Sequence, residues 1–337
     1  MNDELLAILK PHQQEHLVSF WDELTADERQ TLKSQIEDLD LELIGALYRG
    51  GEEAPEWEAL ARRAEPPPAV RLAEHDASEL ASMRSHGERA LRDGRVGMIL
   101  VAGGQGTRLG FDHPKGLFPI GPVSQRTLFQ VLIDRLRAVA NRYECRIPLF
   151  VMTSPATYEE TASYFASQQR CGLDEQDLHI FCQGVMPAVD AETGRILRQS
   201  RSDLALSPDG HGGMLSAFAT SGCLEFARQR GIEILFYGQI DNPLLQVCDP
   251  LLLGCHIASE SEMTTQVVPK EHATERMGNV VQIDGRTRII EYSDLPQDVA
   301  ERRAADGTLR LWAGNLAVHV FDVEFVASMV GQRDQLP

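Results

Sequence analysis

The chemistry that this 337-residue chain could perform is concentrated in one glycine-rich turn that follows an apolar segment. The turn contains Gly103, Gly104 and Gly106, which have no Cβ, so the backbone can approach a ligand and its N–H groups can converge on phosphate oxygens. Arg108 and Lys115 follow and supply positive charge. The combination predicts a site for the phosphates of a nucleoside triphosphate.

The spacing of the turn disfavours two common kinds of nucleotide site. A dinucleotide-binding fingerprint has a third glycine five residues after its first, and counted from Gly104 that position is Leu109. A Walker A loop has glycine directly before its lysine, whereas here Pro114 precedes Lys115. The glycine spacing is therefore wrong for a nicotinamide dehydrogenase. A glycine-rich turn that binds nothing is the remaining alternative, and the residues at 107–110 disfavour it.

Two further apolar segments end in polar side chains that suit a bound nucleotide. Gln183 follows the segment at 178–182, and its amide can both donate and accept hydrogen bonds, as the edge of uracil requires. Asp241 follows the segment at 233–239, where a carboxylate is well placed to hold Mg²⁺ against triphosphate oxygens. Each side chain could instead cap a turn. A second protein ligand for the metal is not evident in this segment.

Alternating strand and helix patterns would bring these side chains together. Buried apolar runs separated by helical patterns are typical of an α/β fold with a mostly parallel sheet, in which ligands bind at the carboxyl ends of the strands. Three later runs look like added strands, with Asp284-Gly285 as a hairpin turn. We expect strands at 96–101, 147–154, 178–182, 233–239, 263–269, 278–283 and 288–292, and helices at 127–136, 158–169 and 215–230.

The first part of the chain has a purely helical pattern. Thr25 and Glu28 have the spacing of a capping box, and apolar residues then recur at three- or four-residue steps. Glycine and proline between 50 and 68 predict a linker. We therefore expect an N-terminal helical region with a Pro-rich linker at 1–90 and a catalytic domain at 91–337.

Composition and charge limit the classes of function. With 43% hydrophobic and 24% charged residues, the chain is typical of a soluble globular protein. A formal net charge of −18 argues against nucleic acid as a partner, although a local cationic loop can still hold a triphosphate. The six cysteines lack Cys-x-x-Cys spacing and predict thiols in a reducing compartment. Without a signal-peptide pattern or a run of 18 apolar residues, the cytoplasm is the expected location, with no membrane partner.

The glycine-rich turn also carries a family resemblance. The stretch from Ala102 to Gly110, followed by Pro114-Lys115-Gly116, resembles the signature of the eukaryotic-type UDP-sugar pyrophosphorylases, most closely the UDP-N-acetylhexosamine pyrophosphorylases. The resemblance implies a Rossmann-like, mixed but mostly parallel sheet of the nucleotide-diphospho-sugar transferase (GT-A-like) type. It assigns catalytic roles to Arg108 and Lys115, and nucleotide binding to Ala102, Gly103, Gly104, Gly106, Thr107, Gln183, Gly210 and Asp241, with Asp241 next to the metal.

The segments that resemble the family's sugar site disagree about the sugar. A second glycine-rich turn lies at 207–213. There the resemblance places Gly210 beside uracil and His211 against the sugar phosphate. N-acetylhexosamine enzymes have Asn where this chain has His211, and UDP-glucose pyrophosphorylases have His. The segment that contains Asn315 instead favours the N-acetylhexosamine branch. The resemblance places Glu291, Tyr292 and Asn315 near the hexose and leaves glucose, galactose, N-acetylglucosamine and N-acetylgalactosamine 1-phosphates open.

The reaction that the resemblance implies joins UTP to a hexose 1-phosphate and releases pyrophosphate, with Mg²⁺ as cofactor. UDP-N-acetylhexosamine is the expected product, and a UDP-glucose or broad-specificity pyrophosphorylase is the alternative. A non-catalytic sensor that binds UDP-sugar is an alternative function of a different class. Family members continue beyond the position of Pro337 with a β-rich region and a further lysine that reaches the phosphates. Without a substitute for that lysine, we expect reduced turnover.

Overall fold

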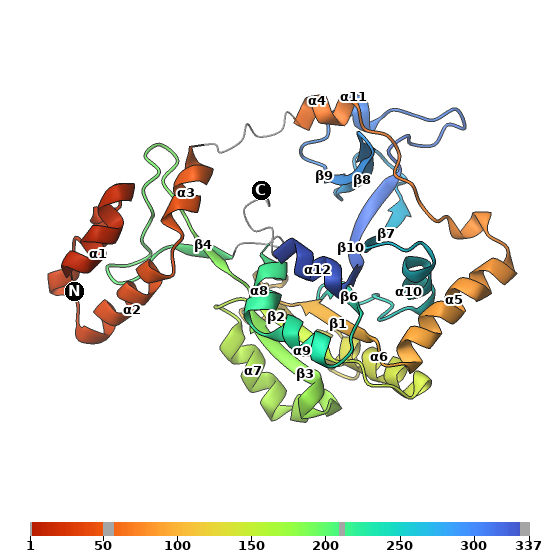
Figure 1. Cartoon of the computed structure of the whole chain (residues 1–337), viewed down its shortest axis with the longest axis horizontal. Helices are drawn as coiled ribbons and strands as arrows, with labels where there is room; N and C mark the ends of the chain where they lie inside the picture. The colour runs from red at the N-terminus through yellow and green to blue at the C-terminus, as the bar shows by residue number, and fades with distance from the viewer. Residues whose placement is uncertain (1, 50–56, 209–212, 331–337) are drawn as a thin grey trace. The chain divides into compact units, whose positions relative to one another are not determined.

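The structure is a computed structural model that describes residues 2–49, 57–208 and 213–330. Contacts within the chain divide it into two compact units. The first unit joins Met1–Glu56 to Gly184–Gly210, and the second joins Trp57–Gln183 to His211–Pro337. Figure 1 shows the elements of both units by label and colour. Each unit is described by itself.

The first unit packs three helices onto a small two-stranded sheet. The capping box predicted at Thr25 and Glu28 is present at the start of the second helix. The side chain of Gln14 ties the two chain segments together, because its Nε2 donates to the carbonyl of Gly194 at 3.1 Å and its Oε1 accepts from the N–H of Ile196 at 2.9 Å. The elements are α1 (Asn2–Leu9), α2 (Ala26–Glu37), α3 (Leu41–Tyr48), and the antiparallel pair β4 (Val185–Pro187) and β5 (Leu206–Pro208).

The second unit is built on a mixed sheet whose centre is parallel. Four neighbouring strands run parallel in the order β3-β2-β1-β6, and antiparallel strands continue the sheet from β6. This confirms the expected mixed α/β class. The strands are β1 (Val96–Val101), β2 (Leu149–Thr153), β3 (Leu178–Cys182), β6 (Ile234–Gln239), β7 (Met263–Pro269), β8 (Asn279–Ile283), β9 (Arg286–Ile290) and β10 (Ala313–Asp322).

Helices cover both faces of this sheet, so its central strands are buried on both sides (Figure 1). Alternate residues of β1 show the division: Met98 and Leu100 pack in one apolar cluster, and Ile99 and Val101 pack in another. The first cluster includes α5 (Ala77–Arg92), α6 (Leu128–Tyr143), α7 (Tyr158–Ser167) and α10 (Pro250–Ala258), and the second includes α8 (Met214–Thr220), α9 (Cys223–Gln229) and α12 (Val323–Val330).

Two expectations about local structure were wrong. The single helix expected at 215–230 is two helices, because Gly222 adopts a left-handed conformation with φ of 80° between α8 and α9. Within the stretch expected to be a linker, α4 (Trp57–Arg62) forms and joins a small apolar cluster with β8, β9 and α11 (Gln297–Ala300). The hairpin predicted at Asp284-Gly285 is confirmed, with positive φ at both residues. Across the described ranges, no helix is both long and apolar enough to span a bilayer.

Candidate nucleotide and sugar phosphate site

The parallel centre of the sheet brings the predicted nucleotide residues to one edge. The glycine-rich loop follows β1, Gln183 follows β3 and Asp241 follows β6. Because β3, β2, β1 and β6 are parallel neighbours, their carboxyl ends all lie at the same edge. Gly103 and Asp241, which are 138 residues apart in the sequence, therefore follow two strands that pair directly.

The loop after β1 is closed by its own backbone. The N–H of Lys115 donates to the carbonyl of Gly104 at 3.0 Å, and the N–H of Gly106 donates to the carbonyl of His113 at 2.9 Å. Gly106 therefore shapes the loop, since a Cβ there would lie 2.7 Å from the carbonyl oxygen of Phe111. Within the described ranges, the N–H groups of Gly103 and Gly104 donate to no protein acceptor. These two groups are available to an anion.

The ammonium of Lys115 meets the carboxylate of Asp241 beside this loop. Nζ lies 3.2 Å from Oδ2, and the two side chains are 25% and 50% exposed. A Cβ built on Gly104 would lie 3.7 Å from the same Nζ. A cation, a carboxylate and free backbone donors thus share one accessible place, as a site for a metal-bound triphosphate needs.

The amide of Gln183 lies against the start of the loop at Gly103. Its side chain is nearly buried, and its Oε1 is 3.1 Å from the position that a Cβ on Gly103 would take. Glycine at 103 therefore makes room for the predicted base-reading amide. Ser154 at the end of β2 completes this contact, because its Oγ donates to the carbonyl of Gly103 at 2.8 Å. Ser154 was not among the predicted site residues, although two hydroxyls at the end of an apolar run were a usable signal.

The other predicted nucleotide residues differ in what they offer. Ala102 is wholly buried, and its N–H donates to the carbonyl of Met152 at 2.8 Å, so it continues the strand. Thr107 and Arg108 are exposed, and Arg108 forms no ion pair with any residue in the described ranges. Gly210 and His211 lie outside the residues that the structure describes.

Two of the three predicted sugar residues in the described ranges meet at Gly278. The N–H of Asn315 donates to the carbonyl of Gly278 at 2.9 Å, and Oε1 of Glu291 is 3.2 Å from the position of a Cβ on that glycine. The side-chain oxygen of Asn315 accepts from the N–H of Ala317 at 2.9 Å inside a bulge of β10. Its amide nitrogen therefore remains available to donate to a ligand. Tyr292 is exposed next to Glu291.

A buried lysine that the sequence reasoning missed supports this part of the site. Lys270 is 6% exposed, and its Nζ donates to Oδ1 of Asn279 at 2.7 Å. Its stem lies over Gly314, where a Cβ would be 3.2 Å from Cγ. Burial lowers the pKa of the Lys270 ammonium, and the nearby Glu275 partly offsets this. The cation thus contacts β8 through Asn279 and lies beside Gly314, the neighbour of Asn315 in β10.

The metal that the family resemblance implies can be compared with the groups at the loop. Within the described ranges no cluster of three or more His, Cys, Asp or Glu side chains could hold a metal by itself. Mg²⁺ is commonly bound by one or two carboxylates together with substrate phosphates and water. A single accessible carboxylate at Asp241, beside free N–H donors, fits that mode of binding.

Comparison with known proteins identifies the family to which this chain belongs. Residues 53–336 match the family described as UTP--glucose-1-phosphate uridylyltransferase. The chain belongs to this family, which confirms the resemblance noted in the glycine-rich turn.

Several individual relatives carry the names of N-acetylhexosamine or N-acetylglucosamine enzymes. The chain is 32% identical to the UDP-N-acetylhexosamine pyrophosphorylase-like protein 1 of Homo sapiens, over 96% of this chain and 66% of that protein. It is also 32% identical to UDP-N-acetylglucosamine diphosphorylase 2 of Arabidopsis thaliana, over 96% of this chain and 67% of that protein. A crystal structure of the uridine diphosphate N-acetylglucosamine pyrophosphorylase from Trypanosoma brucei superposes with a TM-score of 0.86 at 27% identity, covering 99% of this chain and 68% of that one. The chain thus spans about two thirds of the length of these relatives.

The pair between Lys115 and Asp241 is predicted to contribute little to stability. Both side chains are partly exposed, so solvent screens their attraction. We expect Lys115→Met and Asp241→Asn each to change the free energy of unfolding by less than about 1 kcal/mol in urea denaturation followed by circular dichroism. A loss of about 3 kcal/mol in either variant would instead make the pair a structural element.

Proposed function

We propose that the chain is a UTP:sugar-1-phosphate uridylyltransferase that makes UDP-N-acetylhexosamine and pyrophosphate. One observation carries the proposal: the Lys115 ammonium lies 3.2 Å from the Asp241 carboxylate, beside the free N–H groups of Gly103 and Gly104. Membership of the family and the names of the relatives support the same reaction. A cytoplasmic location remains part of the proposal.

The proposed reaction is a direct displacement at phosphorus. An oxygen of the sugar 1-phosphate forms a bond to the α-phosphorus of UTP, and the bond from that phosphorus to the pyrophosphate oxygen breaks. The electron pair leaves with pyrophosphate, so no covalent intermediate with the protein is needed. The task of the chain is to align two anions and to offset their charge. Lys115 and the loop N–H groups would hold the phosphates, and the exposed Arg108 adds a second cation.

The metal would be held through Asp241. Asp241 would hold Mg²⁺ there, and the ion would supply positive charge that offsets part of the charge of the phosphates. The contact between Lys115 and Asp241 already keeps this carboxylate at the loop, and its half-exposed oxygens are accessible to such an ion.

Base and sugar would be selected on opposite sides of the phosphates. The nearly buried Gln183, pressed against Gly103, presents an amide that matches the donor and acceptor edge of uracil. Glu291 can accept hydrogen bonds from two hydroxyls, and the amide nitrogen of Asn315 can donate to the acyl oxygen of an N-acetyl group. His211 is the residue that favours glucose 1-phosphate over an N-acetylhexosamine 1-phosphate, because UDP-glucose pyrophosphorylases have His at this position.

Removing the Lys115 charge should abolish most of the activity while leaving the fold intact. Lys115→Met is expected to lower the rate of pyrophosphate release by about a hundredfold or more, because one preorganised charge at the reacting phosphates is lost. Lys33→Met is the matched control, since Lys33 is similarly exposed at 26% and also faces a carboxylate, that of Glu37 at 3.5 Å. Equal rates in the two variants would remove Lys115 from the mechanism.

Activity should depend on a divalent metal and on Asp241. Excess chelator is expected to stop pyrophosphate release and added Mg²⁺ to restore it. Asp241→Asn should lower the rate by about tenfold or more and raise the Mg²⁺ concentration needed for half-maximal rate, since one metal ligand is weakened. Asp298→Asn serves as the control, because that exposed carboxylate pairs with Arg62 at 2.9 Å. Release that continues in chelator would contradict the metal assignment.

The sugar preference can be read from parallel assays. We expect UTP to react at least about tenfold faster with N-acetylglucosamine or N-acetylgalactosamine 1-phosphate than with glucose or galactose 1-phosphate. The reason is the hydrogen bond from the Asn315 amide to the N-acetyl oxygen, since losing such a bond costs about 1–3 kcal/mol. Comparable rates on all four would indicate a broad-specificity enzyme. Tight UDP-sugar binding in a titration without any pyrophosphate release would favour the sensor instead.

A further inference from the structure

The carboxylate of Asp241 is carried by a short turn that projects from the end of β6. Within the turn, the N–H of Asn242 donates to the carbonyl of Gln239 at 3.2 Å, and the N–H of Leu245 donates to the carbonyl of Asn242, also at 3.2 Å. The side-chain oxygen of Asn242 accepts from the N–H of Leu244 at 3.2 Å. These bonds fix the shape of the turn but do not attach it to the rest of the second unit.

A further attachment comes from α6, where the bonded residue lies 108 positions before Pro243 in the sequence. The guanidinium of Arg135, on α6, donates to the carbonyl of Pro243 and, at 3.1 Å, to the carbonyl of Leu245. We propose that Arg135 is a positioning residue for the reaction: it clamps the turn so that Asp241 stays at the phosphate loop. This inference rests on the proposed function, and nothing in Arg135 itself would touch the substrates.

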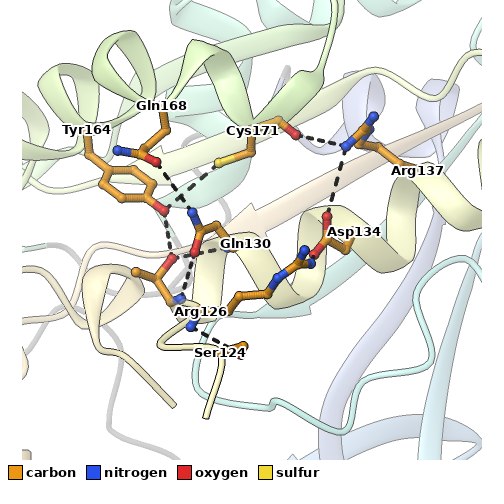
Figure 2. A network of polar contacts seen from close by, with 9 residues as sticks. Ser124, Arg126, Gln130, Asp134, Arg137, Tyr164, Gln168 and Cys171 are labelled. Carbon is orange, nitrogen blue, oxygen red and sulfur yellow. Dashed lines mark hydrogen bonds and ion pairs between the residues drawn. The ribbon is translucent and has the colours of Figure 1, made fainter. Parts of the chain in front are cut away.

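The charged neighbours of Arg135 on α6 pair with one another and with other residues, not with Arg135. Figure 2 shows that Asp134 pairs with Arg126 and Arg137, on the side of the helix that faces the turn at Cys171. Within the described ranges Arg135 has no carboxylate partner, and both of its hydrogen bonds go to backbone carbonyls. Both bonds come from Nη1, whose two N–H groups point in fixed directions in the plane of the guanidinium, so one side chain can hold two carbonyls two residues apart.

The turn depends on this clamp because its outer half has little apolar anchorage. Leu244 is 82% exposed, so its side chain contributes little to packing. Leu245 is buried, and its Cδ2 would lie 2.4 Å from a Cβ on Gly238. One side of the turn is thus held by packing against β6, and the other is held by Arg135. Leu132 and Leu136 bury α6 in the same apolar cluster as Leu245, so the helix is a fixed support.

The clamp can be tested by comparing substitutions at two neighbouring positions of α6. Arg135→Met removes both donors and keeps an apolar stem, and Arg135→Lys keeps a charge with fewer donors. Arg137→Met is the matched control, because Arg137 lies on the same helix and bonds to Asp134 and to the carbonyl of Cys171. Two readouts are required: hydrogen exchange of the backbone amides at 239–245 other than Pro243, which has no N–H, without substrate, and kcat and KM for UTP in pyrophosphate release.

For Arg135→Met we expect about tenfold faster exchange at 242–245 and about a tenfold lower kcat, with KM for UTP changed less than twofold, because the phosphate loop itself is untouched. Arg135→Lys should recover part of kcat, and Arg137→Met should match the wild type in both readouts. Unchanged exchange in Arg135→Met, or faster exchange across the whole sheet, would overturn the clamp. Wild-type protein that releases no pyrophosphate would overturn the proposed function, and the exchange comparison would still decide whether Arg135 holds the turn.

Discussion

The pairing register between β1 and β6 is the constraint on which the candidate site depends. Val101 pairs with Gln239, so the loop that starts at Gly103 and the turn that carries Asp241 leave the sheet side by side. Both strands are buried on two faces by different apolar clusters. A slip of one residue would exchange the residues that face those clusters, and the register is therefore strongly fixed. The 3.2 Å contact between Lys115 and Asp241 is a consequence of that register.

The strands, and the position of the glycine-rich loop and Asp241 at one edge of the sheet, could be predicted because their signals are local. A continuous apolar run that ends in Gly or Asp marks both a buried strand and its carboxyl end, and parallel neighbours place those ends together. The break between α8 and α9 was missed because Gly222 lies within an unbroken helical pattern. No local signal reveals that residues 184–210 join the N-terminal segment, because contacts such as Gln14 with Gly194 link positions 180 residues apart.

The residues that support the site were harder to predict for the same reason. Lys270 follows an apolar strand as many exposed lysines do, and only the packing of Gly314 against its stem shows that it is buried. Arg135 shares its helix with the charged residues Asp134, Arg137 and Arg142. Nothing in the sequence of this helix distinguishes Arg135 from Arg137. Such side chains act through tertiary contacts with backbone carbonyls or amides, which leave no pattern in the sequence.

An acidic chain can bind two anionic substrates because the field that matters is local. At physiological ionic strength, charges more than about 8 Å apart in solvent are largely screened, so the net charge of −18 acts weakly on a phosphate at the loop. The Lys115 ammonium lies beside the loop that carries the N–H groups of Gly103 and Gly104, and the exposed Arg108 follows these glycines in the sequence. The half-exposed carboxylate of Asp241 would repel a bare triphosphate, and a divalent ion held by both would offset that repulsion. A carboxylate beside a cation is therefore unfavourable for a nucleotide alone, but it is the arrangement expected for a nucleotide that binds together with its metal.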